Sequence, residues 1–411
     1  MFMLRLSSII FSLFICLTAA SQGNVKKDIA QAKASVKSGK DLEKAENLMR
    51  KLLTDSVNKH NLKIYDALAE VVKKQYEQGN EKLYLKQKYD TASLFTTARK
   101  MFLVYELQDS AESASGKTPK SRKKNAEYLN SVKRNLFNGG LFFIRKQEFS
   151  KAYDMLDTYI DCIDQPLFGG ENNNGNDTGN DSQSRKNDNL NIAAAYWAVY
   201  CGYRMQNPDK ALKYSEMAVK SVKGNARAIQ YVAEAYIMKN DTAMYLSTLH
   251  KGFETYRTSP YFFTRLVDYF NSQNHLDSTK QIIETALQAA PDNTLFLLAQ
   301  SGYLLNTGNY RECVNVCDDL IAGNDTLAEA YYNAGVAYVN MAFVIEKKKQ
   351  KSTTDKQLIQ NYYRKALPYI ERYRSLAPEQ KDKWLAVLYN IYLNLNMGKE
   401  FEEVERLLRM R

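Results

Sequence analysis

The pattern that decides the fold is clearest in the stretch Ala330-Tyr331-Tyr332-Asn333-Ala334-Gly335-Val336-Ala337-Tyr338. Within this stretch, the large Tyr331 is followed four residues later by Gly335 and three residues after that by Tyr338. Spacings of three and four residues place side chains on one face of an α-helix. Because the middle residue of this face is small, a neighbouring helix can approach it closely. The stretch therefore predicts one helix of a tightly packed pair.

The same three positions recur upstream at intervals of 34 residues. The middle position recurs at Val199, Ala233, Val267, Ser301 and Gly335. The first position recurs at Ala195, Ile229, Phe263, Leu297 and Tyr331, and the third at Gly202, Tyr236, Phe270, Leu304 and Tyr338. A period of this length is typical of helix–turn–helix repeats, which stack into a solenoid with a long binding surface rather than a catalytic pocket.

A second helix is expected to follow each of these first helices. Helical spacing is visible at Ala211, Ser215 and Ala218, and again at Thr279, Ile283 and Ala286. Pro291 is expected to close the second of these helices, because proline cannot continue a helix. Gly308 is expected to supply the positive φ of a turn between two helices.

These positions resemble the motif of the tetratricopeptide-repeat (TPR) family, in particular its exported members in Gram-negative bacteria. The matching residues are Phe263, Leu266, Val267 and Phe270 in one unit and Tyr331, Ala334, Gly335 and Tyr338 in another. Tyr245 and Gln300 depart from the motif. The resemblance implies an all-α fold, a right-handed superhelical solenoid of antiparallel helix pairs.

The phasing of the motif divides the chain into segments. We expect a signal peptide at 1–21, degenerate helical repeats at 22–110 and a basic linker at 111–124. A TPR-like unit at 125–166 is followed by an asparagine-rich, low-complexity loop at 167–190, which has too few apolar residues to order itself. TPR repeats span 191–378, with an insertion at about 341–360, and a helix pair closes the chain at 379–411.

The N-terminal segment predicts export. Arg5 precedes an apolar run from Ser8 to Leu17, which is too short to span a bilayer, and small residues follow up to Ser21. An uncleaved anchor is the alternative. We expect a periplasmic protein, possessing no integral membrane segment once the signal is removed.

The sequence offers little for catalysis. Its three histidines, His60, His250 and His275, have no metal-binding or catalytic spacing. Cys313 and Cys317 lie one helical turn apart, at core positions, with no histidine nearby to complete a metal site. We expect no enzyme activity, no metal and no cofactor, although a site assembled from distant residues is left open.

The resemblance implies a binding role. In the TPR family, ligands lie on the concave face, whose positions here are Asn138, Arg145, Arg265, Asp268, Asn333 and Asn340. We expect a scaffold or adaptor that binds a protein or peptide there, in assembly or maintenance of the cell envelope. The full lysine–asparagine–arginine set that clamps a terminal carboxylate in some members is missing.

The charge offers an alternative partner. The net charge is +11, and basic residues gather at 117–134 and 347–351. Such stretches attract anionic partners. Because export argues against nucleic acid, the alternative function is a module that binds an anionic envelope polymer, glycan or peptidoglycan.

A short motif recurs in which Asp precedes Ser or Thr and then Ala, Val, Leu or Thr. It resembles the acceptor motif of a bacterial O-glycosylation system. The acceptors would be Ser56, Thr91, Ser110, Thr242, Ser278 and Thr326. These residue types are also favoured at helix N-termini, so capping is the alternative interpretation.

Overall fold

The structure, a computed structural model, describes residues 24–114, 116, 118–169, 188–220 and 226–409. Throughout these residues the regular elements are helices and no strand occurs, which confirms the all-α prediction. No helix of this described part is long and apolar enough to cross a membrane. The predicted signal peptide and most of the predicted loop at 167–190 lie outside the described residues.

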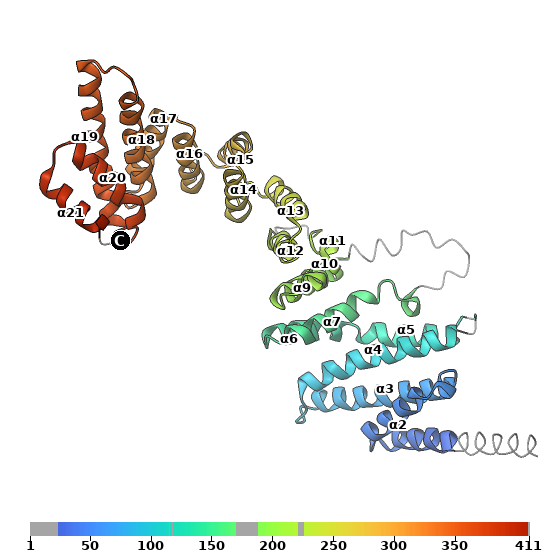
Figure 1. Ribbon diagram of the computed structural model, residues 1–411. Helices are drawn as coiled ribbons and strands as arrows, with labels where there is room; N and C mark the ends of the chain where they lie inside the picture. Colours follow the sequence, from blue (N-terminus) through green and yellow to red (C-terminus); the bar gives the residue numbers. More distant parts are fainter. Residues whose placement is uncertain (1–23, 115, 117, 170–187, 221–225, 410–411) are drawn as a thin grey trace, which may run out of the picture. The chain divides into compact units, whose positions relative to one another are not determined.

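The chain folds into two compact units, an N-terminal unit (Met1–Thr242) and a C-terminal unit (Ala243–Arg411). Figure 1 shows both as stacks of helices in chain order. In each unit, a helix packs mainly against the helices next to it in the sequence. This is the contact pattern of a repeat protein, in which each repeat needs only its neighbours to bury its apolar face.

The N-terminal unit begins with helical residues 24–38. Its further α-helices are α2 (Leu42–Thr54), α3 (Leu62–Tyr84), α4 (Thr91–Ser113), α5 (Arg122–Val132), α6 (Arg134–Arg145), α7 (Phe149–Asp161), α9 (Asn189–Arg204), α10 (Pro208–Lys213), α11 (Ser215–Ala218) and α12 (Ala226–Met238). Two 3-10 turns, η1 (Ser56–Asn58) and η2 (Pro166–Phe168), lie between them.

The basic linker expected at 111–124 is shorter in the structure. The helix α4 continues to Ser113 and α5 begins at Arg122, so both ends of the predicted linker are helical. The guanidinium of Arg122 donates two hydrogen bonds, of 2.9 and 2.7 Å, to the buried carboxylate of Asp109. Arg122, one of the basic residues from which a linker was predicted, therefore joins α5 to α4.

The C-terminal unit contains nine described α-helices. These are α13 (Thr242–Thr255, which starts at the boundary), α14 (Pro260–Ser272), α15 (Leu276–Ala289), α16 (Thr294–Asn306), α17 (Tyr310–Gly323), α18 (Ala328–Glu346), α19 (Thr353–Leu376), α20 (Lys381–Asn394) and α21 (Gly398–Arg409). The predicted turn at 307–309 is confirmed, with Gly308 at φ 82°. Pro291 follows the end of α15, as expected.

The small residues of the motif permit close helix packing, as their pattern predicts. A Cβ added to Gly202 would lie 2.6 Å from the Cα of Ala211, so α9 and α10 meet backbone to backbone. A Cβ on Gly335 would lie 2.6 Å from Cγ1 of Ile370 on α19. Both distances are too short for a real contact, and any larger side chain would push the paired helices apart.

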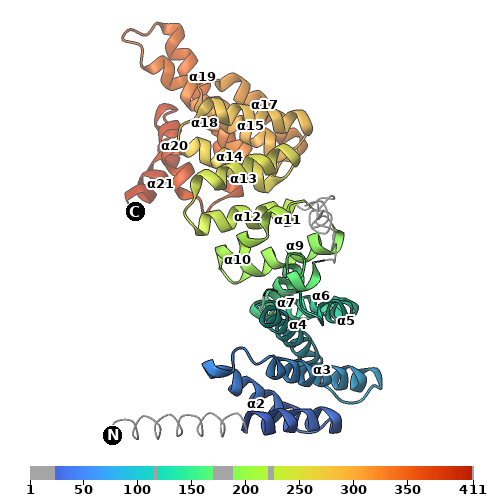
Figure 2. The ribbon, with the colours of Figure 1, turned by 90° about the vertical axis from the view of Figure 1, so that its right-hand side faces the viewer.

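The insertion at about 341–360 lengthens two helices instead of forming a separate loop. It continues α18 to Glu346 and starts α19 at Thr353, and Figure 2 shows both as the long helices of their unit. A capping box fixes the start of α19, with Ser352 and Asp355 bonded reciprocally. The lysine-rich stretch 347–351 forms the connection at the tip of this hairpin.

Candidate functional site

A cluster of large aromatic side chains lies on α9 and on its neighbours α7 and α12. In α9, Tyr196, Tyr200 and Tyr203 are spaced by four and three residues and therefore share one helical face. The residues that α9 buries completely are small, namely Ala194, Ala195, Ala198, Val199 and Cys201. This helix buries its small side chains and leaves its large rings half-exposed.

The rings contact one another in a continuous chain. Tyr231 of α12 stacks on Tyr203, with ring centroids 4.9 Å apart, and lies 5.5 Å from Tyr200 and 6.2 Å from Tyr196. Trp197 lies edge-on to both Tyr196 and Tyr200, at 5.0 and 5.7 Å. Edge-on and offset contacts at these distances are favourable and fix the ring orientations.

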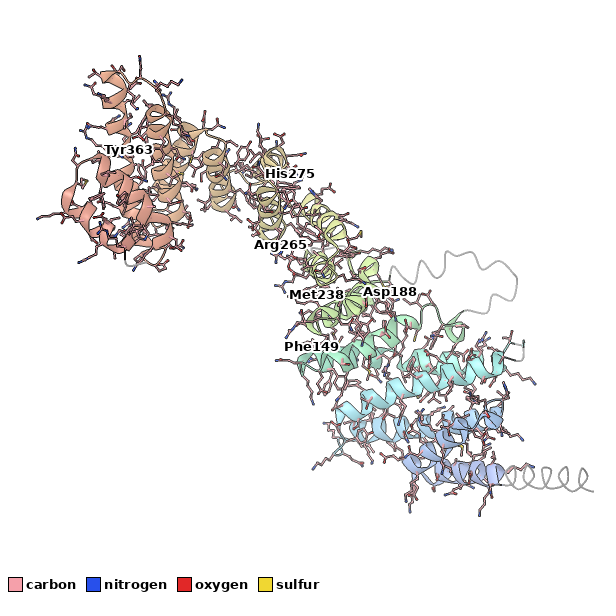
Figure 3. The ribbon with its side chains drawn as sticks, viewed as in Figure 1. Phe149, Asp188, Met238, Arg265, His275 and Tyr363 are labelled. Atoms are coloured by element: carbon pink, nitrogen blue, oxygen red, sulfur yellow. The ribbon has the colours of Figure 1, made fainter. Side chains whose placement is uncertain are left out.

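Arg204 and Phe149 complete this surface at the end of α9. The guanidinium of Arg204 lies over the ring of Phe149, 4.4 Å from its centroid, and donates a 2.6 Å hydrogen bond to the Tyr200 hydroxyl. Phe149 starts α7, where Figure 3 labels it at the edge of the N-terminal unit, and Asp188 marks the opposite end of α9. We call the seven residues Phe149, Tyr196, Trp197, Tyr200, Tyr203, Arg204 and Tyr231 the aromatic face.

The chemistry of the aromatic face suits binding. Burial, then the neighbouring Tyr196 and Tyr200, raise the pKa of Tyr231 to about 12, so its hydroxyl stays protonated at neutral pH. The surface therefore combines ring faces, neutral hydroxyls and one exposed guanidinium. Tyrosine, tryptophan and arginine are the residue types that dominate the energetics of protein interfaces.

The six residues that the TPR resemblance suggested lie on three separate helices. Asn138 and Arg145 are exposed on α6, and Arg265 and Asp268 lie on α14. The Arg265 guanidinium lies 3.9 Å from the ring centroid of Tyr261, on its own helix.

The remaining two, Asn333 and Asn340, lie on α18. Asn333 donates a 2.9 Å hydrogen bond to the Ser301 hydroxyl, which ties α18 to α16. Asn340 lines a shallow pocket of about 290 Å³ beside Tyr310 and Phe343.

The aromatic face is not among the predicted binding residues, because those were taken from the groove positions of the TPR motif. The signal was present in α9, where tyrosines recur with helical spacing on the face opposite the alanines. In the motif, a large residue at the first position is expected to be buried. Here that position is Ala195, which is fully buried, and the adjacent Tyr196 is half-exposed.

The aspartates of the recurring motif include two helix caps. Asp55 accepts a hydrogen bond from the amide of Val57 at η1, and Asp90 accepts from the amides of Ala92 and Ser93 at the start of α4. Of the predicted acceptors, Ser56, Ser110, Thr242 and Thr326 are exposed, and Thr91 and Ser278 are half-buried. Their modification stays a prediction.

Two of the three histidines and the paired cysteines pack against other side chains of the repeats. Cys313 and Cys317 are fully buried in the core that α17 shares with α18. His250 and His275 lie against the ring of Phe270. Within the described residues, no group of three or more His, Cys, Asp or Glu side chains is placed to hold a metal ion.

No protein-family model and no curated protein matches the chain. It is similar to the C-terminal part of a TPR repeat-containing protein from Cytophaga hutchinsonii, at 12% identity over 65% of this chain and 92% of that one, with a TM-score of 0.42. It is also similar to a TPR repeats protein from Bacteroides fragilis, at 13% identity over 67% and 98%, with a TM-score of 0.30. YrrB, described as a TPR protein with an unusual peptide-binding site, shares 13% identity over 64% and 94%, with a TM-score of 0.27.

Likenesses at this level of identity concern the fold alone. In its helix pairs and their 34-residue period, the chain is an all-α repeat protein that resembles the TPR family. Its function has to be argued from its own residues.

Proposed function

We propose that this protein is a scaffold that binds an extended segment of a partner protein along the aromatic face. The observation that carries the proposal is the distribution of residues in α9, which buries alanines and leaves three tyrosines and a tryptophan half-exposed. Packing alone favours the opposite distribution, because burying large rings contributes more stability than burying alanines. Half-exposed rings in mutual contact are already ordered, so a partner loses little side-chain entropy when it binds them.

We infer that the protein acts by binding rather than by catalysis, and that it works in the cell envelope. The first inference is supported by the aromatic face itself, whose hydroxyls and guanidinium can donate hydrogen bonds but include no activated nucleophile. The second is supported by the sequence of residues 1–21, with its basic start and short apolar run.

Photo-crosslinking in native cells tests the proposal. A photoreactive phenylalanine analogue would replace Tyr203 on the aromatic face, and in a second strain the control residue Tyr84, which is 86% exposed at the end of α3. We expect one partner protein to be crosslinked from position 203 and not from position 84, as read by mass spectrometry. Identical crosslinked species from both positions would contradict the proposal.

The hairpin tip supports a second candidate, binding of an anionic envelope polymer. Its lysines Lys347, Lys348, Lys349, Lys351 and Lys356 are all exposed. Only Lys348 is paired with a carboxylate in the described structure, at 2.8 Å from Asp355. Binding to purified wall material should then weaken as salt is raised, because salt screens exposed charges. Unchanged binding after Lys347, Lys349 and Lys351 are replaced by glutamine would exclude the tip.

A further inference from the structure

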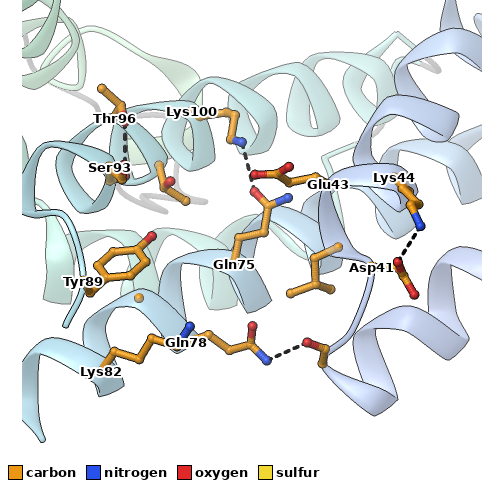
Figure 4. A pocket seen from close by; sticks show the side chains of 14 residues that line it. Asp41, Glu43, Lys44, Gln75, Gln78, Lys82, Tyr89, Ser93, Thr96 and Lys100 are labelled. Carbon is orange, nitrogen blue, oxygen red and sulfur yellow. Dashed lines mark hydrogen bonds and ion pairs between the residues drawn. The ribbon is translucent and has the colours of Figure 1, made fainter. Parts of the chain in front are cut away.

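The N-terminal unit contains a cavity between α2, α3 and α4, far along the chain from the aromatic face. Its volume is about 640 Å³, within the range of small-molecule sites. Figure 4 shows its lining, which is mainly polar and comes from all three helices, the turn before α2 and the connection before α4.

Most of the charged side chains around this cavity are in ion pairs within the protein. Lys44 pairs with Asp41 at 2.9 Å, and Lys100 pairs with Glu46 at 2.6 Å. Glu46 is only 7% exposed. Burial alone would raise the pKa of Glu46, but hydrogen bonds from Lys100 and Arg50 hold it below its ordinary value. The remaining charged lining residues, Lys82 and Glu43, have opposite signs. Of the five charged lining residues, Asp41, Lys44 and Lys100 are thus held in ion pairs within the protein.

Neutral hydrogen-bonding groups are fixed around the cavity. Gln75 is held at both ends, donating to Glu46 at 3.0 Å and accepting from Lys100 at 2.9 Å. Gln78 donates to the carbonyl of Gly39 at 3.0 Å. The Thr96 hydroxyl donates to backbone carbonyls of its own helix, at 3.1 Å, and its oxygen can still accept. These groups present amide and hydroxyl oxygens that are already oriented.

An aromatic ring forms one wall of the cavity. Tyr89 lies so close to α3 that a Cβ added to Gly79 would be 2.8 Å from two of its ring carbons and from its hydroxyl oxygen. Any other residue at position 79 would therefore displace the ring. The ammonium of Lys82 lies over the ring of Tyr89, 5.7 Å from its centroid. The cavity thus pairs a flat apolar surface with the oriented amides and hydroxyls.

We propose that this cavity binds a neutral saccharide unit. A sugar ring presents hydroxyls that match the amide and hydroxyl groups of Gln75, Gln78 and Thr96, and an apolar C–H face that matches the ring of Tyr89. It brings no charge to a site in which Asp41, Lys44 and Lys100 are already held in ion pairs. This site is independent of the aromatic face, so either proposal can fail without the other.

A glycan microarray probed with the full chain tests the proposal, followed by calorimetric titration with the free neutral saccharide that binds best. Thr96→Val and Gln78→Leu keep side-chain volume and remove hydrogen-bonding groups. Each is expected to weaken the Kd about tenfold, the effect of one lost hydrogen bond. Thr248→Val is the control, because Thr248 is a half-buried helical threonine whose hydroxyl donates to the carbonyl of Met244 four residues before it, in the other unit.

Three outcomes would overturn the proposal. One is that no neutral saccharide on the array binds the wild-type chain. Another is that Thr96→Val and Gln78→Leu bind as tightly as Thr248→Val does while all three remain folded by circular dichroism. The third is displacement of the saccharide by inorganic phosphate or by dialanine, which would assign the cavity to an anionic or a zwitterionic ligand.

Discussion

The tyrosines of α9 and those of α18 and α19 are used in different ways. In the C-terminal unit, Tyr363 donates to Glu346 at 3.1 Å and Tyr369 donates to Asp318 at 2.7 Å. These hydroxyls bond to carboxylates of the same unit, and the ring of Tyr363 is fully buried. On the aromatic face, the Tyr200 hydroxyl instead accepts from the exposed Arg204. The first arrangement stabilises packing, and the second leaves half-buried rings beside an exposed cation.

The largest expected effect is on partner binding. The double variant Tyr200→Ala, Arg204→Ala should weaken the affinity for the crosslinked partner by at least about a hundredfold, because central aromatic and arginine residues each contribute about 2 kcal/mol or more. Surface plasmon resonance with the purified partner measures this.

The matched control is Tyr331→Ala, Arg372→Ala, which removes a similar cation–ring pair, with Arg372 6.0 Å from the Tyr331 centroid, in the C-terminal unit. Equal loss in both double variants would remove the distinction between the two clusters.

The next largest effect is on stability, at the close contact between α18 and α19 in the C-terminal unit. Gly335→Ala places a Cβ against Ile370 and should lower the free energy of unfolding of that unit by about 1 to 3 kcal/mol. Gly302→Ala in α16 meets no described atom within 4 Å, and should raise it by about 0.5 to 1 kcal/mol. Urea denaturation monitored by circular dichroism compares them. Destabilisation of similar size at both glycines would show that packing is not the cause.

In the N-terminal unit, a single carboxyl oxygen without a hydrogen-bond partner provides a test that depends on pH. Among the described residues, Oε1 of Glu106 on α4 has no hydrogen-bond partner. Burial, and then the charge of Asp161, raise its pKa from 4.5 to about 7. The native state therefore binds more protons than the unfolded state between these values, and stability falls as pH rises through this window.

Glu106→Gln should remove this loss. At pH 8 it should stabilise the unit by about 1 to 2 kcal/mol, discounted for partial exposure, with little effect at pH 4. Urea midpoints at the two pH values, for variant and wild type, measure the difference. A stabilisation that is the same at both pH values would contradict the assigned pKa.

The smallest effect tests the two kinds of tyrosine directly. Tyr363→Phe removes the bond to Glu346 and should cost about 1 kcal/mol of stability. Tyr200→Phe removes only a bond to an exposed arginine and should cost less than about 0.5 kcal/mol. Thermal unfolding resolves the two. A larger loss for Tyr200→Phe would show that the aromatic face serves packing.

The fold follows from the sequence far more closely than the candidate sites do. The positions of Gly335 and Pro291 anticipated a close helix contact and a helix end, because both depend on local spacing and backbone chemistry. The aromatic face depends on which side of α9 faces its neighbours, and the alanines that occupy the buried side decide this. The cavity beside Tyr89 depends on Gly39, Gln78 and Lys100, which the sequence separates widely and folding brings together.

The long hairpin of α18 and α19 has a consequence for how the chain can be altered. Residues added symmetrically at its tip extend two antiparallel helices outward and leave the repeat contacts around Gly335 in place. Adding about seven residues to each helix corresponds to roughly two full turns, which restores the original facing of the tip. Lys347, Lys349 and Lys351 therefore mark a position where a fluorescent label or an affinity tag can be inserted with the helix stack left intact.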